Sequence, residues 1–205
     1  MKLSIRVSDL QAALTCAAVK DIRSYLNGVY MEYIPNGDGG TLTFVGTDGH
    51  ALFVGTAPAV FDDGEQSAPF WMTIPADTVK AACKSKMPCV TLADMPDGRY
   101  TLADTVFAPL DGKYPDFRRV VPDRVSGEIG NYDGDLLARA QKALNFYFQS
   151  KGKLFKLTQG GKNGCAVMAG NSRDACVVIM PFTCQIEAFG GMDIPAMPAP
   201  LRAVA

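Results

Sequence analysis

The single histidine, His50, stands two residues after Asp48 and is the first place where the sequence could carry chemistry. A histidine beside a carboxylate can serve as a general base or, with further ligands, hold a metal ion. A metal site needs three or four converging ligands, and the chain offers no HxxxH pattern, no second histidine and no paired carboxylates. We interpret Thr47, Asp48 and Gly49 as a turn between two strands. A hydrolase that uses His50 and Asp48 is kept as a third hypothesis.

Two further patterns could suggest ligand chemistry. The glycines at 37, 39 and 40 lack the GxxxxGK[ST] spacing of a phosphate loop and do not lead into a helix. The aromatic residues 146–148 could stack on nucleic-acid bases, but a helix end that packs on a sheet explains them better. We therefore predict no catalytic residue, no metal and no cofactor, and the protein is not expected to be an enzyme.

Composition narrows the class of protein. The chain has 205 residues, 48% hydrophobic and 20% charged, with a net charge of -1, which is ordinary for a globular protein. No global basic field draws it to nucleic acid, so any DNA contact must come from a local patch. The N-terminus lacks the apolar stretch of a signal peptide, and no run of about 18 apolar residues occurs, so a cytoplasmic protein is predicted.

The six cysteines form no CxxC pair and stand mostly in apolar segments. Buried free thiols are therefore predicted rather than zinc ligands or disulfides. These cysteines are Cys16, Cys83, Cys89, Cys165, Cys176 and Cys184.

The first part of the chain alternates between helical and strand periodicity. Ser8 and Gln11 have the spacing of a capping box and predict a helix that fades near Lys20. Strand patterns follow Gly28, with a hairpin turn at residues 36–40, and a second helix is predicted after Pro75. Further strands are expected near residues 90–93, 100–103 and 106–110. A strand, a helix and three strands thus occur twice before residue 122.

The prolines 115 and 122 and the polar run 123–130 predict a connection between two domains. A third helix is expected from Asp135, followed by strands near residues 154–158, 165–169 and 175–180. We predict one domain at 1–122, an incomplete second domain at 123–184, and a tail at 185–205. The tail has a possible edge strand and is otherwise expected to be disordered, because its prolines cannot continue a helix.

Four motifs carry a resemblance to a known family. They are Tyr25-Leu26-Asn27-Gly28-Val29-Tyr30-Met31-Glu32, Thr47-Asp48-Gly49-His50-Ala51-Leu52, the run 112–122 (GKYPDFRRVVP) and Val177-Val178-Ile179-Met180-Pro181-Phe182. In order and spacing they resemble the second and third domains of the bacterial DNA polymerase III beta subunit, the beta sliding clamp. Position 51 is Ala where that family commonly has Arg, and the first domain and half of the last have no counterpart in this chain.

The resemblance implies an α+β, DNA clamp-like fold of repeated β-α-β-β-β units, with helices on one face of curved antiparallel sheets. It also implies a pocket between domains where short linear peptides of polymerases and repair proteins bind. Carried over to this chain, the pocket residues are Leu26, Thr47, Gly49, His50, Leu52, Pro115, Arg119, Val120, Val178, Met180, Pro181 and Phe182. An apolar cleft with a few polar groups at its edge suits such a peptide.

Basic residues on or beside the three predicted helices are a local patch that could contact phosphates. From sequence alone they also fit solvated helix faces, but the resemblance places these helices toward double-stranded DNA. Such binding would be independent of sequence and steeply dependent on salt. The candidate residues are Lys20, Arg23, Lys80, Lys84, Lys86, Arg139 and Lys142.

Two main hypotheses follow. The first is a processivity factor that assembles as a homo-oligomer around DNA and holds a polymerase or repair protein. The second is a monomeric peptide-binding adaptor or decoy that does not encircle DNA. In addition, Gln185, Ile186 and Phe189 have the spacing of the peptides that bind bacterial clamps, so the tail could dock into a neighbouring subunit.

Overall fold

The structure is a computed structural model that describes residues 1–36, 39–62, 68–150, 155–162, 164–170, 172 and 174–182. The predicted tail, with its possible edge strand, lies outside these residues. The helices are α1 (Val7–Cys16), α2 (Ala76–Ala82) and α3 (Gly134–Tyr147), with short 3-10 turns at Ser24–Leu26 and Phe117–Arg119. The strands are β1 (Lys2–Arg6), β2 (Gly28–Asn36), β3 (Gly39–Thr47), β4 (Ala51–Pro58), β5 (Val60–Phe61), β6 (Phe70–Pro75), β7 (Cys89–Asp94), β8 (Tyr100–Leu102), β9 (Thr105–Phe107), β10 (Lys156–Thr158), β11 (Ala166–Ala169) and β12 (Ala175–Ile179).

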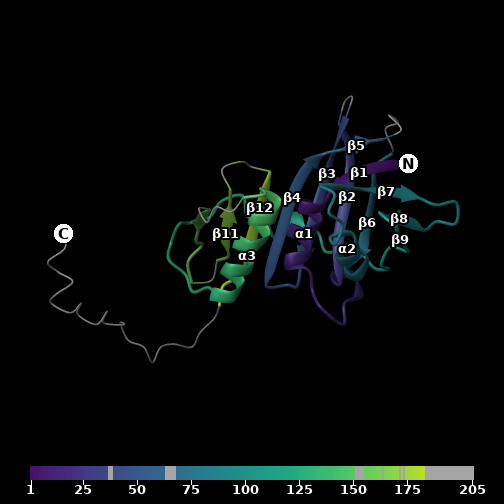
Figure 1. The fold of residues 1–205 in the computed structure, drawn as a ribbon. Helices are drawn as coiled ribbons and strands as arrows, with labels where there is room; N and C mark the ends of the chain where they lie inside the picture. The colour runs from purple at the N-terminus through teal and green to yellow at the C-terminus, as the bar shows by residue number, and fades with distance from the viewer. Residues whose placement is uncertain are drawn as a thin grey trace, which may run out of the picture.

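The described strands form two antiparallel sheets. The larger sheet has seven strands in the order β10-β11-β12-β4-β3-β2-β6, and the smaller has five in the order β5-β1-β7-β8-β9. Strand β12 pairs directly with β4, with Val178 opposite Leu52. One continuous sheet therefore holds β2 to β4 together with the last described strand, β12 (Figure 1).

The repeated unit predicted from the sequence is confirmed. Strand β1, helix α1 and strands β2 to β4 form one copy, and β6, α2 and β7 to β9 form the second. The first strand of each copy pairs into the sheet of the other, since β1 lies beside β7 and β6 beside β2. Helix α3 and strands β10 to β12 repeat the helix and three strands, and no strand is assigned in the described residues between β9 and α3.

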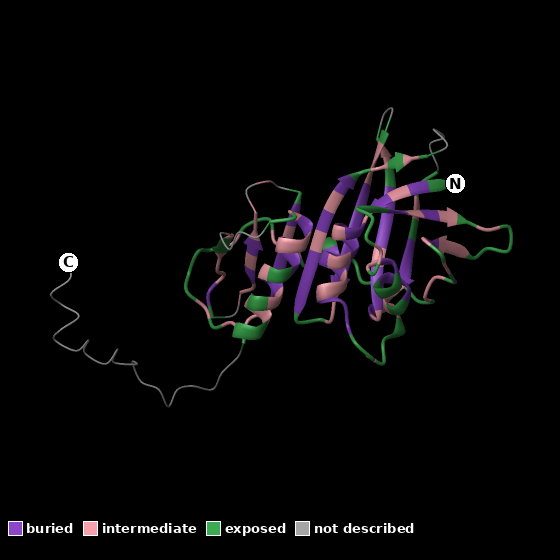
Figure 2. Ribbon diagram, in the orientation of Figure 1, coloured by how far each residue is buried: buried purple, intermediate pink, exposed green. Residues whose placement is uncertain are grey.

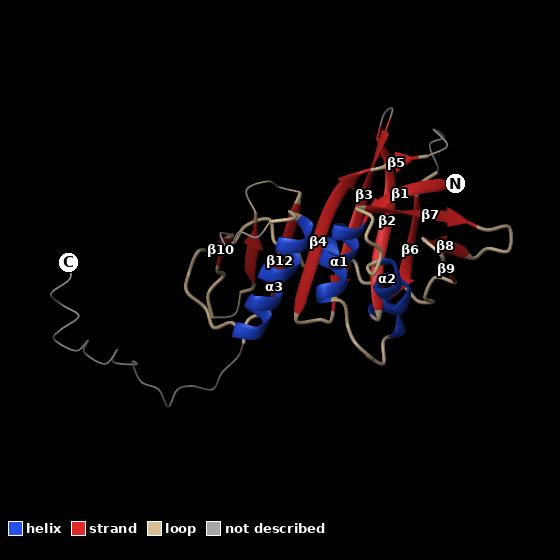
Figure 3. Ribbon diagram, in the orientation of Figure 1, coloured by secondary structure: helices blue, strands red, loops and turns tan. Residues whose placement is uncertain are grey.

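The three helices lie side by side on one face of the seven-stranded sheet, as the family resemblance implied (Figures 1 and 3). Alternate residues of each strand point to this inner face, as period-two geometry requires. Phe44, Phe53 and Val177 are fully buried there against the helices and the smaller sheet. Figure 2 shows how buried residues run along the strands of this sheet. At Gly46 the helix comes so close that a Cβ atom would lie 1.8 Å from the carbonyl oxygen of Ala13. Only glycine fits at that position of β3.

The opposite, outer face of the same sheet is covered in a different way. Residues 111–121, here named the strap, run across it and place Tyr114 and Phe117 on the strands. These two rings join Leu26, Leu52 and Val178 in a second, smaller apolar cluster. The strap is thus a single layer of chain over one end of the sheet.

The prediction for the first helix is wrong at both ends. Helix α1 begins at Val7 with Arg6 as its N-cap, and Ser8 makes no capping hydrogen bond. Instead the buried Asp9 carboxylate pairs with the Arg6 guanidinium at 2.8 Å. The helix ends at Cys16 because Ala17 is extended, and Lys20 has a φ of 57°, which a helix does not allow.

The cysteine prediction holds in part. Cys16, Cys83, Cys89, Cys165 and Cys176 are free thiols. Cys16 is buried, and burial raises the pKa of its thiol to about 12, so it is inert at neutral pH. Cys83, Cys165 and Cys176 are only half-buried, and Cys89 is exposed, contrary to the prediction, because it begins β7 next to the loop after α2. Cys184 lies outside the described residues.

Candidate functional site

The predicted pocket residues converge where β12 meets β4, on the outer face of the sheet. The register places Thr47, Leu52 and Val178 in one row across β3, β4 and β12. The 3-10 turn that holds Leu26 closes one side, and the strap closes another. The result is a cavity of about 240 Å³, named here the junction pocket. Its lining is Arg23, Leu26, Thr47, Gly49, His50, Ala51, Leu52, Tyr114, Pro115, Phe117, Val120, Val178 and Met180.

Most of the residues predicted for this pocket line it, but three do not. Arg119, the last residue of the 3-10 turn in the strap, is exposed and is not among the lining residues. Pro181 and Phe182 continue past the pocket, where the Phe182 backbone N–H donates to the Asn131 carbonyl at 2.7 Å. Sequence reasoning missed Arg23, Tyr114 and Phe117 as lining residues, whereas Ala51, identified there as a departure from the family, does line the pocket.

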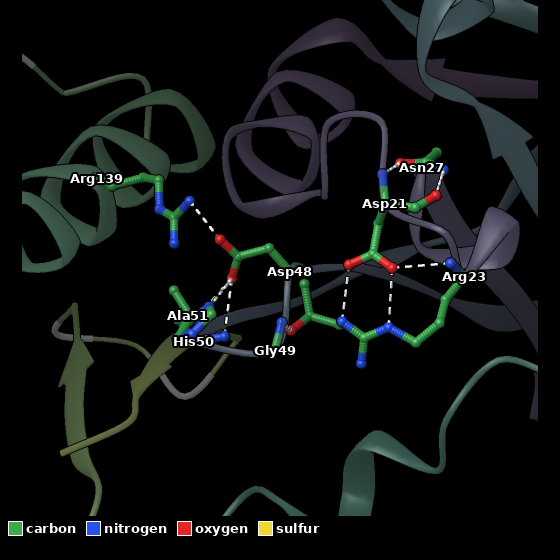
Figure 4. A network of polar contacts seen from close by, with 9 residues as sticks. Asp21, Arg23, Asn27, Asp48, Gly49, His50, Ala51 and Arg139 are labelled. Atoms are coloured by element: carbon green, nitrogen blue, oxygen red, sulfur yellow. Dashed lines mark hydrogen bonds and ion pairs between the residues drawn. The ribbon is translucent and has the colours of Figure 1, made fainter. Parts of the chain in front are cut away.

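The β3–β4 turn forms the polar edge of the pocket and is held by Asp48. Its carboxylate accepts hydrogen bonds from the backbone N–H groups of His50, at 2.9 Å, and Ala51, at 3.0 Å (Figure 4). The Gly49 N–H donates to Thr47 Oγ1, and Gly49 has a φ of 94°, which suits glycine. The turn predicted at this position is therefore present.

Arg139 reaches this turn from helix α3. Its Nη1 donates to Asp48 Oδ2 at 2.8 Å, and both side chains are mostly buried. Partial burial by itself would raise the pKa of the Asp48 carboxyl, but the hydrogen bonds from Arg139, Ala51 and His50 outweigh it and hold that pKa below its usual value. A cation on α3 thus fixes the pocket edge that β3 and β4 provide.

A second ion pair fixes the other edge. Arg23 binds the Asp21 carboxylate through its Nε at 3.0 Å and its Nη2 at 2.8 Å (Figure 4). These bonds lower the pKa of Asp21 to about 2. Asp21 and Asn27 also exchange two hydrogen bonds of 2.8 Å between side chain and backbone. The loop between α1 and β2 is therefore tied in place beside the pocket.

The strap is anchored by rings and by one ion pair. Tyr114 stacks on Tyr30 with ring centroids 4.6 Å apart, and Phe117 lies against the same ring at 6.2 Å. Arg118 binds the buried carboxylate of Glu32, which also accepts a hydrogen bond from the Tyr30 hydroxyl. Burial and the neighbouring Glu32 raise the pKa of Tyr30 to about 12, so this hydroxyl stays protonated at neutral pH.

The geometry around His50 gives no support to the hydrolase hypothesis. Its side chain is 75% exposed, and its Nδ1 lies 3.9 Å from Asp48 Oδ1, beyond hydrogen-bond distance. In the parts of the chain that the structure describes, no group of three or more His, Cys, Asp or Glu residues is arranged to hold a metal ion. No helix there is long and apolar enough to cross a membrane.

Comparison with known proteins agrees with this arrangement. No family model matches the chain. The beta sliding clamp of Caulobacter vibrioides is 30% identical over 146 residues, which is 68% of this chain and 38% of that protein. The beta sliding clamp of Vibrio cholerae is 32% identical over 111 residues, which is 53% of this chain and 29% of that protein.

Solved structures share the fold at lower identity. The Helicobacter pylori beta clamp bound to a DNA ligase peptide has a TM-score of 0.70 at 11% identity, and the match covers 89% of this chain and 66% of that one. The Pseudomonas aeruginosa DNA polymerase III subunit beta has a TM-score of 0.65 at 17% identity, over 90% of this chain and 66% of that one. This chain is a beta-clamp-like protein. The matched region is less than half the length of its curated relatives.

The basic residues predicted for the DNA face of this beta-clamp-like protein are placed unevenly. Lys84, Lys86 and Lys20 are exposed in the segments that follow α2 and α1. Lys80, on α2, pairs with Asp77 at 3.0 Å, and Lys142, on α3, lies 6.0 Å from the Phe146 ring. The helices that carry or precede these residues are on one face of the sheet.

Two members of that set have different surroundings from those predicted. Arg23 does not end a helix, because α1 stops at Cys16, and its guanidinium is bound to Asp21 beside the junction pocket. Arg139 turns toward the β3–β4 turn and pairs with Asp48. In the beta-clamp-like protein both side chains form ion pairs beside the pocket, and their contact with DNA stays a prediction.

Proposed function

We propose that this chain is a processivity factor that holds a DNA polymerase or repair protein on double-stranded DNA. The partner would be held through a short linear peptide that binds the junction pocket. One observation carries the proposal: residues from four separate segments, predicted from the sequence as a peptide site, line one apolar cavity. The Helicobacter pylori clamp, which has the same fold, was solved with a DNA ligase peptide bound.

The chemistry of the pocket suits a peptide with an apolar anchor. Leu26, Leu52 and Val178 are buried at its base, while Met180 is 43% exposed at its mouth. Methionine adapts its shape to different side chains, which favours a site that serves several partners. His50 and Thr47 at the edge supply polar groups for the peptide backbone.

For the DNA face we propose Lys20, Lys84, Lys86 and Lys142, with Lys80 once its contact with Asp77 is exchanged for a phosphate. An exposed ion pair of that kind is weak, so the exchange costs little. We also propose that residues 1–122 and 123–184 act as a complete and an incomplete clamp domain, and that several copies assemble around the duplex.

The peptide part of the proposal is tested by fluorescence polarisation with a labelled Gln-Ile-Glu-Ala-Phe peptide, the sequence of residues 185–189. Met180→Glu places a charge at the pocket mouth and should weaken binding by about tenfold or more. Met87→Glu, which alters a methionine 65% exposed beside α2, is the matched control and should bind as the wild type does. Equal affinity in the two variants would contradict the proposal.

The DNA part is tested with a labelled duplex of random sequence at several salt concentrations. Lys84→Glu with Lys86→Glu should weaken binding and reduce its salt dependence, because two phosphate contacts are removed. Lys156→Glu, on β10, should leave both unchanged. Light scattering then decides the assembly: a closed oligomer agrees with a ring, whereas a monomer that still binds the peptide would favour the adaptor or decoy.

A further inference from the structure

Trp71 is an unusual residue for its position on the outer face. It lies on β6, at the edge of the seven-stranded sheet, and is 70% exposed. Exposed apolar residues on an edge strand favour unwanted association. A large apolar side chain that is exposed therefore indicates a binding surface more than a buried one does. The register places Trp71 opposite Glu32, on the same side of the sheet as Tyr30 and the strap.

A second cavity lies beside this tryptophan. It has a volume of about 530 Å³ and is lined by rings and apolar side chains, with Lys113 and Asp111 as its charged groups. Tyr30, Trp71, Tyr114 and Pro109 are among the lining residues. Aromatic-lined grooves of this kind bind extended peptides, in particular segments that contain proline. We name it the Trp71 groove.

The junction pocket and the Trp71 groove share a wall. Tyr114 lines both, and its ring is fixed between them by stacking on Tyr30. From Leu52 to Trp71 the path crosses from β4 to β6 and shifts by four residues along the strands. With strands about 4.8 Å apart and about 3.3 Å per residue, that is about 20 Å, or roughly six residues of extended peptide.

We propose that the peptide held in the junction pocket continues across Tyr114 and places a second apolar or proline residue against Trp71. This inference rests on the proposed function and specifies its partner: a linear segment of about a dozen residues with two apolar anchors roughly six positions apart. Lys113 at the groove edge would favour an acidic residue next to the second anchor. Because Tyr114 lines both cavities, a single peptide can occupy the two of them.

The test uses fluorescein-labelled probes of three kinds, five peptides in all, with the wild-type chain. The short probe is Gln-Ile-Glu-Ala-Phe. The two long probes carry six additional residues, either Pro-Leu-rich with one Glu or alternating Gly and Ser, each made with the extension at the amino end and at the carboxyl end. One orientation of the Pro-Leu probe should bind about tenfold more tightly than its Gly-Ser counterpart.

Trp71→Ala should abolish this gain and leave the affinity for the short probe unchanged. Because Trp71 is mostly exposed, the variant should fold normally, which its thermal unfolding midpoint verifies. Val60→Ala, which alters another exposed apolar residue of an edge strand, is the control and should retain the gain.

The outcomes separate this inference from the proposed function. If the short probe does not bind the wild type, the peptide-binding function fails and this inference fails with it. If the short probe binds but the Pro-Leu extension gives no gain in either orientation, or the gain persists in Trp71→Ala, only the inference is overturned. A change in oligomer mass on Trp71→Ala would also overturn it, because Trp71 would then belong to a contact between copies.

Discussion

The two faces of the seven-stranded sheet are covered in different ways. On the inner face, Phe53 and Val177 are fully buried beneath helices and the second sheet. On the outer face, the neighbouring Leu52 and Val178 are covered only by the strap and the 3-10 turn that holds Leu26, and a cavity remains beside them. The same strands therefore supply a close-packed core on one side and a binding surface on the other.

This difference shows how a sheet of one composition supports both stability and recognition. Core side chains that are packed from two directions leave little free volume, so substitutions there destabilise the folded protein. A single extended segment such as the strap cannot fill every gap between strands. We expect changes on the inner face to alter folding and changes on the outer face to alter binding.

The largest effect is expected for Phe53→Ala. Its ring is fully buried and lies 5.9 Å from the Tyr147 ring, so truncation leaves a cavity in the inner core. The free energy of unfolding should fall by about 3 to 5 kcal/mol, measured by urea denaturation. Val178→Ala is the outer-face comparison and should cost less, because it enlarges a cavity already open to solvent. A larger loss for Val178→Ala would remove the distinction between the faces.

An intermediate effect is expected for Arg118→Ala, which releases the strap from Glu32. The Glu32 carboxylate is buried and would lose its cation, although half of Arg118 is exposed and the pair is partly screened. The free energy of unfolding should fall by about 1 to 2 kcal/mol, and the affinity for the short peptide should fall as well. Adding Glu32→Gln should recover part of the stability, and a double-mutant cycle measures the coupling.

The control for that experiment is Arg119→Ala, which changes the neighbouring arginine on the exposed side of the strap. Its unfolding curve should match that of the wild type. If both variants lose the same stability, the strap is not held by the Glu32 pair.

The smallest effect is expected for two aspartates whose pKa values are shifted in opposite directions. Hydrogen bonds hold the pKa of Asp48 below its ordinary 3.8, so its stabilising contribution is present above that pH and is lost as the pH falls through its folded value. Burial raises the pKa of Asp9, so its contribution is present below 3.8 and is lost as the pH rises through its folded value. Asp48→Asn and Asp9→Asn should therefore change the slope of stability against pH in opposite directions.

Both slopes are measured by urea denaturation at intervals between about pH 2.5 and 6, which is roughly the range where carboxylates titrate. Asp77→Asn, at a residue that is 94% exposed, serves as the reference variant. Parallel slopes for Asp48→Asn and Asp9→Asn would contradict the expectation.

Local patterns predicted much of this fold. Alternation in β2 identified its two faces, and the repeated strand and helix order is the one observed. The end of α1 could not be predicted, because residues after Cys16 keep an apolar character while the backbone leaves the helix at Ala17. Tyr114 and Phe117 look like ordinary loop residues until the strap crosses the outer face.

The site was predicted where motifs carried it and missed where distant residues meet. Leu26, Leu52 and Met180 converge as expected. Arg139 lies 91 residues from Asp48, and nothing in its helix distinguishes it from a cation that faces solvent. The same is true of Arg23, whose role depends on a loop conformation that its own sequence does not reveal.

The direct pairing of β12 with β4 means that two stretches more than a hundred residues apart must join before Val178 can stand beside Leu52. Any molecule that occupies the space between them therefore favours the joined form over every separated one. The affinity of such a molecule would depend on how completely β12 is paired with β4 as well as on its contacts with the pocket. A saturating peptide should accordingly raise the temperature at which residues 175–179 come away from the rest of the sheet.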